Sequence, residues 1–320
     1  MGDDSTRRSL WGLRSDVGVV LPRNKPSRTR PQRRSWRLSL EGKKKAELPE
    51  LELTRRDLER EIVGRKIKDV EAAGMAMLPR YKNRKSFGAP LEGMKIAGVM
   101  RQGEFLLFPL DSEDILVVRM GTGIFRRNAN KDKEEPGTEV AITFTQGGQL
   151  RYVNTDGDGE FAVVSKEEVM TEFPDLNDPA VDPIDTPLSW LNFRDLIEGH
   201  PTTLKELLTD GKALLSIGSI YADEVLFDAG LRYDRSSTTL STQEVRRLYR
   251  SLVETLHNVI KYRGTTLEDR PWADVFGEPG VFDQHIQVYQ REGELSPRSR
   301  TPIQRAKFKG DWTYFCETQV

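Results

Sequence analysis

Apolar residues first recur at helical spacing near position 50 of the 320-residue chain. Leu51, Leu58 and Ile62 fall on one face of a helix, which is the spacing of a buried helical stripe. Pro49 suits the first turn of that helix, and Gly64 suits the position just beyond its end. The pattern therefore predicts a helix that begins at Pro49 and stops before Gly64.

The next hundred residues show shorter apolar runs that are typical of strands. We predict strands within 99–110, interrupted at 101–104, and at 115–118. Two further runs, 140–144 and 150–153, flank Gln146-Gly147-Gly148-Gln149, which suits a hairpin turn. This half of the chain is predicted to be an antiparallel β-sandwich that follows a leading helix.

Residues 174–188 are rich in Pro and Asp and are predicted to be a linker. Helical spacing follows, and the predicted helices are 190–197, 204–208, 220–227 and 242–262. Ser241-Thr242-Gln243-Glu244 has the pattern of a capping box before the last of these helices. After Gly280, residues 286–289 and 312–315 are expected to be the arms of a hairpin. The predicted fold class is α+β.

Charged residues are distributed unevenly along the chain, although its formal net charge is only -1. Residues 1–45 hold 13 Lys and Arg against 4 Asp and Glu, and the remaining residues hold 36 against 46. We interpret 1–45 as a disordered basic arm, and we expect an acidic body that binds DNA poorly, because affinity for DNA depends on basic residues at the phosphates. A solvated tail or a start codon assigned too early are alternatives for the arm.

Single features of composition set further expectations. No apolar run approaches the roughly 20 residues that a membrane helix needs, so we expect no membrane span. Cys316 is the one cysteine, which excludes a disulfide within the chain and a multi-cysteine metal site and suits the cytoplasm. We expect a monomer.

Four segments carry a more specific signal: Glu47–Glu52, Ile217–Phe227, Tyr262–Leu267 and Val288–Gly293. In sequence, order and spacing they resemble the signature segments of the formamidopyrimidine-DNA glycosylase (Fpg/Nei) family, including its helix–two-turn–helix motif. The resemblance implies domains at 46–173 (β-sandwich), 189–280 (helix–two-turn–helix) and 281–320 (β-hairpin finger).

The resemblance also implies a chemistry, in which the amine of an N-terminal Pro attacks the sugar and an adjacent Glu handles protons. The matching residues are Ala46 and Glu47, with Glu50 close by. Ala46 follows 45 residues, so its nitrogen is an amide and not a nucleophile unless proteolysis exposes it. We therefore expect AP-lyase chemistry to be lost, while Glu47 can still support hydrolysis of an N-glycosidic bond.

The positions that grip DNA in the family are also changed. Candidate DNA or ligand contacts are Arg101, Ser219 and Tyr221, but the family's hairpin Lys is replaced by Glu104. Its void-filling Met falls at Gly121, and its finger Arg falls at Asp311. The family's intercalating wedge aligns with the loop that carries Asp156 and Asp158, and acids repel the DNA backbone. We expect weakened DNA binding.

Two segments bear on metal binding. The family's zinc cysteines fall at Ser296, Ser299, Cys316 and near Gln319, and zinc needs about four Cys or His ligands; we expect a zincless finger and no cofactor. The segment 154–159 resembles the start of an EF-hand loop, but position twelve would be Ser165 and the flanks resemble strands. A polar loop is favoured there over a calcium site.

Three functions remain open. The first is a diverged glycosylase that acts through Glu47. The second is a non-catalytic member of the fold that binds DNA or a protein, and the third is an enzyme repurposed toward a small nucleoside-like metabolite.

Overall fold

A computed structural model describes residues 45–128, 135–177, 180–186 and 188–320. The predicted basic arm lies outside these residues, except for Lys45. None of the helices in these ranges is long and apolar enough to cross a membrane.

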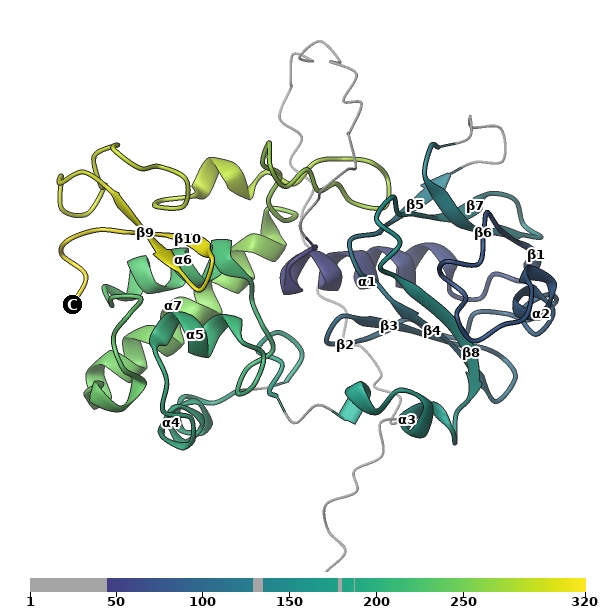
Figure 1. Cartoon of the computed structure of the whole chain (residues 1–320), viewed down its shortest axis with the longest axis horizontal. Helices are drawn as coiled ribbons and strands as arrows, with labels where there is room; N and C mark the ends of the chain where they lie inside the picture. The colour runs from purple at the N-terminus through teal and green to yellow at the C-terminus, as the bar shows by residue number, and fades with distance from the viewer. Residues whose placement is uncertain (1–44, 129–134, 178–179, 187) are drawn as a thin grey trace, which may run out of the picture. The chain divides into compact units, whose positions relative to one another are not determined.

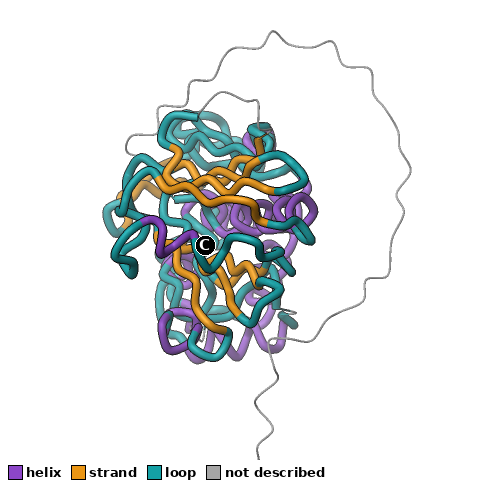
Figure 2. Tube along the Cα trace, turned by 90° about the vertical axis from the view of Figure 1, so that its right-hand side faces the viewer, coloured by secondary structure: helices purple, strands orange, loops and turns teal. Residues whose placement is uncertain are grey.

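The first half of the described chain begins with helix α1 (Leu48–Ile62) and continues with two antiparallel sheets, as predicted. One sheet has the order β1-β6-β7-β5, from strands Ile67–Ala72, Thr138–Phe144, Gln149–Val153 and Ile124–Asn128. The other has the order β2-β3-β4-β8, from strands Met100–Gln102, Phe105–Pro109, Asp114–Arg119 and Glu160–Ser165. In Figure 1 both sheets lie around α1, and in Figure 2 their strands (orange) fall into separate groups.

One apolar core joins the two sheets and the leading helix. It includes Leu58 from α1, Phe108 from β3 and Ile142 from β6, each no more than 2% exposed. Apolar side chains from two facing sheets that share one core define a β-sandwich, so the predicted architecture is confirmed. The predicted hairpin turn at 146–149 joins β6 to β7.

Three short elements complete this half: helix α2 (Arg84–Gly88), helix α3 (Val169–Glu172) and the 3-10 turn η1 (Pro174–Asn177). η1 lies within the segment predicted as a linker. In the same segment Val181 forms a bridge with Leu214, and Asp182 accepts a hydrogen bond from Arg101. The described parts of this segment are therefore tied to both halves of the chain.

The second half is helical and contains α4 (Trp190–Gly199), α5 (Leu204–Thr209), α6 (Ser219–Ala229) and α7 (Thr242–Lys261), with the short turn η2 (Ser237–Thr239). The four predicted helices are confirmed. Ser241 and Glu244 form the predicted capping box at the start of α7. These helices have a core of their own, in which Leu207, Val225 and Leu252 are fully buried.

The C-terminal segment contains the turn η3 (Phe282–His285) and a hairpin of β9 (Gln304–Phe308) and β10 (Asp311–Phe315). The expectation for 312–315 is confirmed, but that for 286–289 is wrong, because β10 pairs with β9. The backbone N–H groups of Gln287, Val288 and Tyr289 instead donate to the carboxylate of Glu224, at 2.8–2.9 Å. Those donors are then not free to pair with a strand.

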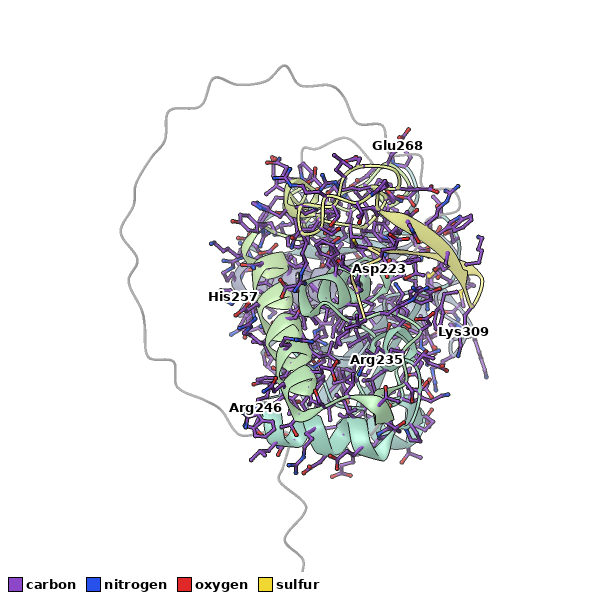
Figure 3. The ribbon with its side chains drawn as sticks, turned by 90° about the vertical axis from the view of Figure 1, so that its left-hand side faces the viewer. Asp223, Arg235, Arg246, His257, Glu268 and Lys309 are labelled. Carbon is purple, nitrogen blue, oxygen red and sulfur yellow. The ribbon has the colours of Figure 1, made fainter. Side chains whose placement is uncertain are left out.

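A buried ion pair ties the hairpin to the helices. Lys205 Nζ of α5 lies 2.6 Å from Asp223 Oδ1 of α6, which also accepts a hydrogen bond of 2.5 Å from Thr313 Oγ1 of β10. Figure 3 labels Asp223 and, near the hairpin's turn, Lys309. This network fixes α6, whose first turn forms part of the site described next.

Candidate active site

Glu47 precedes α1, but its side chain does not cap that helix. It lies instead at the start of α6, where the backbone N–H of Ile220 donates to Oε1 at 3.4 Å. Gly218, with φ of +88°, makes this approach possible, because a Cβ at that position would overlap the Glu47 carboxyl group. The positive end of the α6 dipole favours the ionised form of a carboxylate placed there.

Arg270 is the second partner of Glu47. Its Nη1 donates to Glu47 Oε1, and both residues are less than a tenth exposed. A tight turn places this arginine, since Leu267 and Arg270 exchange backbone hydrogen bonds of 3.1 Å. Burial lowers the pKa of the Arg270 guanidinium from its usual value. The buried Glu47 carboxyl group therefore faces positive charge from Arg270 and from the start of α6.

Glu50 lies one turn further along α1 and is 3% exposed. Its Oε1 accepts hydrogen bonds from the Tyr221 hydroxyl and, at 3.0 Å, from the backbone N–H of Thr265. The Tyr221 hydroxyl also lies 2.7 Å from Thr265 Oγ1. Burial raises the pKa of Glu50 to about 7, although these hydrogen bonds oppose the rise. The folded protein therefore favours the protonated form of Glu50 more than water does.

We call Glu47, Glu50, Tyr221, Thr265 and Arg270 the entrance site. Three of its buried polar atoms have no hydrogen-bond partner: Glu47 Oε2, Glu50 Oε2 and Arg270 Nε. Buried polar groups are nearly always matched, so unmatched ones call for an explanation such as a catalytic role. Two neighbouring buried carboxyl groups in different electrostatic environments are a pattern of acid–base catalysis.

The structure brings together three residues expected from the sequence, Glu47, Glu50 and Tyr221, although the chain separates the first from the last by more than 170 positions. Sequence reasoning missed Thr265 and Arg270. Thr265 belongs to the matched segment 262–267, which was a usable signal. Arg270 stands in an aperiodic stretch, and no motif marked it.

Other expected site residues lie apart from this group or are already engaged. Ala46 is half-buried and packs against the sandwich core. Arg101 is buried, donating to Glu52 at 3.0 Å and to Asp182 at 2.6 Å. Ser219 is the first residue of α6, and its carbonyl accepts from Lys205 Nζ at 2.9 Å.

Asp156 and Asp158 lie in the loop between β7 and β8. Asn154 Oδ1 accepts from the backbone N–H of Asp156 at 2.8 Å, and Asp158 accepts from the N–H and hydroxyl of Thr122 at 2.8–3.0 Å. Hydrogen bonds within the protein therefore hold this loop. In the described ranges no group of three or more His, Cys, Asp or Glu is arranged to hold a metal.

The four positions that match the family's zinc ligands come together in the finger. Ser299 Oγ lies 2.8 Å from Cys316 Sγ, Ser296 Oγ accepts from the backbone N–H of Arg298, and Gln319 Oε1 accepts from the Cys316 N–H at 2.6 Å. We call these residues, with Thr301, the finger cluster. Burial opposes ionisation of the Cys316 thiol, but hydrogen bonds from Ser299, Thr301 and Thr318 lower its pKa to about 6. One thiol, two hydroxyls and an amide do not fit a structural zinc site.

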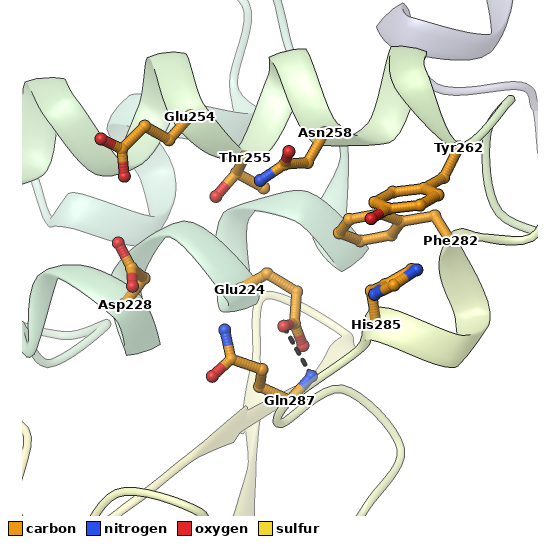
Figure 4. A pocket seen from close by; sticks show the side chains of 9 residues that line it. All are labelled: Glu224, Asp228, Glu254, Thr255, Asn258, Tyr262, Phe282, His285 and Gln287. Carbon is orange, nitrogen blue, oxygen red and sulfur yellow. Dashed lines mark hydrogen bonds between the residues drawn. The ribbon is translucent and has the colours of Figure 1, made fainter. Parts of the chain in front are cut away.

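A separate pocket of about 240 Å³ lies between α6, α7 and the segment 282–287. Figure 4 shows Asp228 and Glu254 at one end, the stacked rings of Tyr262 and His285 at the other, and Glu224 between them. Neither Glu47 nor Glu50 lines it. It is therefore distinct from the entrance site.

The family models for the formamidopyrimidine-DNA glycosylase N-terminal domain and its H2TH domain match residues 46–160 and 180–270. The formamidopyrimidine-DNA glycosylase of Geobacillus kaustophilus is 32% identical over 270 residues, covering 84% of this chain and 97% of that protein. The one from Moorella thermoacetica is 34% identical over 266 residues, covering 82% and 94%.

Solved structures agree with these matches. Lactococcus lactis Fpg in a complex with DNA that contains an abasic site has a TM-score of 0.74 and 27% identity, covering 85% of this chain and 98% of that one. MutM bound to DNA with carbocyclic 8-oxo-G has a TM-score of 0.73 and the same identity and coverage. With its sandwich, its H2TH helices and its hairpin finger, the chain belongs to the formamidopyrimidine-DNA glycosylase family.

Proposed function

We propose that this protein hydrolyses an N-glycosidic bond in DNA and uses Glu47 as the general base. The observation that carries the proposal is the pairing of two buried carboxyl groups in different environments. Arg270 and the start of α6 place positive charge against Glu47, while burial raises the pKa of Glu50 to about 7. Environments that separate two carboxylates in this way identify acid and base roles.

Glu47 Oε2 lacks a protein partner and can accept a proton from water. The water oxygen then bonds to the sugar carbon C1′, and the bond from C1′ to the base breaks with its electron pair on the base. Glu50 can supply or take a proton near neutral pH, with Tyr221 and Thr265 hydrogen-bonded to it. The Ala46 nitrogen takes no part in this scheme, since it is an amide.

The substrate we propose is damaged DNA, in line with the relatives solved as complexes with DNA. The grip on DNA is expected to be weak. Glu104 occupies the place of a cation, and Asp156 is exposed in the loop that aligns with the wedge. Arg101 is engaged with Glu52 and Asp182, so it adds little positive charge to the surface.

The test is release of base from duplexes that contain 8-oxo-G or Fapy-dG, measured for the parent and for Glu47→Gln. General acid–base groups contribute about 10²–10⁴-fold to rate, so the variant should lose activity by at least about that lower factor. Glu113→Gln, at an exposed glutamate in the turn before β4, is the matched control and should match the parent. Absence of base release, with and without residues 1–45, overturns the proposal.

A second candidate is a non-catalytic DNA-binding member of the family. The ion pair between Arg270 and Glu47 favours this candidate, because it engages the proposed general base inside the protein. The test is the salt dependence of affinity for an undamaged duplex, before and after deletion of 1–45. Binding that falls steeply with salt and is lost with the arm, together with no base release, supports this candidate. No affinity for DNA at any salt concentration argues against it.

We also propose that the finger folds without zinc, because its ligand positions hold hydrogen-bonding side chains instead. Mass spectrometry under native conditions should show no bound zinc, and a chelator should leave the unfolding midpoint unchanged. One zinc ion per chain would contradict this part of the proposal.

A further inference from the structure

Glu47 is closed off from solvent in this structure. Its side chain is 6% exposed, and its Oε2 is buried, as is Oε2 of Glu50. A general base can act only when the group that gives up the proton comes within hydrogen-bond reach of it. One of the elements that cover Glu47 must therefore move before water and a sugar can reach the carboxyl group.

Hydrogen bonds reach the Glu47 carboxyl group from two elements, the start of α6 and the turn Leu267–Arg270. The start of α6 is held in the helical core, where Tyr221 is fully buried. The turn is held more loosely, because its two end residues exchange backbone hydrogen bonds with each other, and Glu268 and Asp269 at its tip are exposed. Segments with few buried contacts open at the lowest cost, so the turn is the element that can move.

The chain is fixed on both sides of this turn. Before it, the backbone N–H of Thr265 donates to Glu50 Oε1 at 3.0 Å. After it, Trp272 is 5% exposed, and its carbonyl accepts a hydrogen bond of 2.6 Å from Thr266 Oγ1. The residues between Thr266 and Trp272 therefore form a short loop between two fixed points, and this loop can open without unfolding its surroundings.

We propose that the turn Leu267–Arg270 is an autoinhibitory latch on the entrance site. In the closed state, Arg270 engages the Glu47 carboxyl group and keeps water and a sugar away from it. In the open state, Glu47 is accessible, and the guanidinium, which stays charged, is free to bind a phosphate of the DNA. The inference rests on the proposed function, since it concerns access to the same general base.

The tip of the turn allows the latch to be loosened without a change in the entrance site. Gln290 Nε2 donates to Asp269 Oδ2 at 3.0 Å, so Asp269→Ala removes a contact that holds the tip. Glu268→Ala is the matched control, because it removes the neighbouring exposed acid, whose side chain makes no such contact within the described part of the chain. Arg270→Gln would open the latch directly, but it also leaves a buried carboxylate without its cation, so the two tip variants carry the test.

The measurement is the accessibility of Glu47 in the full-length protein without DNA. A water-soluble carbodiimide and an amine label accessible carboxyl groups, and peptide mass spectrometry assigns the label to a residue. Asp269→Ala should raise the labelling rate of Glu47 by about two- to tenfold, the range expected from the loss of one hydrogen bond. Glu268→Ala should match the parent. Labelling of the buried Glu224 should not rise in either variant, which separates opening of the turn from unfolding.

The same two variants are then tested for base release from duplexes that contain 8-oxo-G. If the parent is active, Asp269→Ala should be faster by about the same factor, whereas a contact that only supports the fold would leave the rate equal or lower. Unchanged labelling of Glu47 in Asp269→Ala, an equal rise in Glu268→Ala, a parallel rise at Glu224, or no faster release than an active parent overturns the inference. Increased labelling of Glu47 alone in Asp269→Ala, with no base release from any of the proteins, would uphold the latch while removing the proposed hydrolysis.

Discussion

The entrance site and the finger cluster are both polar and buried, but they differ in how fully their hydrogen-bonding groups are matched. In the entrance site Glu47 Oε2, Glu50 Oε2 and Arg270 Nε lack partners. No side chain of the finger cluster is among the unmatched buried atoms of the described chain. The finger cluster resembles an ordinary protein interior, whereas the entrance site keeps unused hydrogen-bonding capacity.

This difference separates two kinds of change at positions where the family has functional residues. In the finger, hydroxyl and amide groups stand where cysteines are expected, and they satisfy one another. At the start of α1, the carboxylates remain, and Arg270 from a distant loop compensates the charge of Glu47. A region that only had to fold could dispense with buried charge, since apolar side chains of similar volume are often as stable. Retained charge therefore favours a role in binding or chemistry.

The largest effect is expected from Arg270→Ala, which leaves the Glu47 carboxylate buried without its cation. Removing one partner of a buried ion pair costs about 3–5 kcal/mol, so urea unfolding should show a loss of that order. Arg250→Ala, which removes an exposed pair with Glu254 at 3.9 Å, is the control. It should change the free energy of unfolding by less than about 1 kcal/mol. Equal effects of the two variants would refute the view that the entrance site stores buried charge.

The next effect concerns pH and Glu50. The pKa of Glu50 is about 7 in the folded protein, against an ordinary value of 4.5, so the folded state holds the proton more tightly. The stabilisation is fully present below about pH 4.5 and is lost as pH rises to about 7, a change of about 3 kcal/mol at 1.36 kcal/mol per unit. Glu50→Gln lacks this titration. Between pH 4.5 and pH 7.5 the free energy of unfolding should therefore fall more in the parent than in the variant. Equal changes in the two proteins would contradict the assignment.

A smaller effect is expected in the finger cluster from Gln319→Leu. This change removes the acceptor for the Cys316 N–H and the donor to the Leu231 carbonyl. Leaving such a buried group unmatched costs about 1–3 kcal/mol, which chemical unfolding can measure. Gln304→Ala is the control, because its amide makes one longer, exposed contact with Glu317 at 3.3 Å. An unchanged free energy of unfolding in Gln319→Leu would show that the hydrogen-bonding groups of the cluster are not tightly matched.

The smallest effect is expected from Glu104→Ala, which removes the exposed pair with Lys45. The free energy of unfolding should change by less than about 1 kcal/mol. A larger loss in thermal unfolding would mean that this exposed pair supports the fold.

Local patterns in the sequence were enough to predict most of the fold. Helical spacing gave the four helices of the second half, and Ser241 with Glu244 gave the start of α7. Prediction failed at 286–289, where an alternating apolar stretch suggested a strand. The backbone of that stretch binds Glu224, some 60 residues earlier, and a local pattern cannot reveal such a partner.

The candidate site was predictable in part for the same reason. Glu47, Glu50 and Tyr221 belong to recognisable segments, so the resemblance marked the two glutamates as catalytic candidates and Tyr221 as a candidate DNA or ligand contact. Their contacts with one another were not predicted. Arg270 reaches Glu47 across 223 positions from a stretch without periodicity, and its role depends on tertiary packing alone. The monomeric state, the cytoplasmic location and the weakened DNA binding stay predictions.

The contact of Glu224 with Gln287, Val288 and Tyr289 also has a consequence for solubility. This β-prone stretch is held out of any sheet by one carboxylate, and burial raises the pKa of that carboxylate. Protonation in acid weakens the acceptor and releases three backbone donors at once. Exposed donors next to apolar side chains can pair with other chains, so acidification should promote intermolecular β-aggregation that begins at residues 286–289.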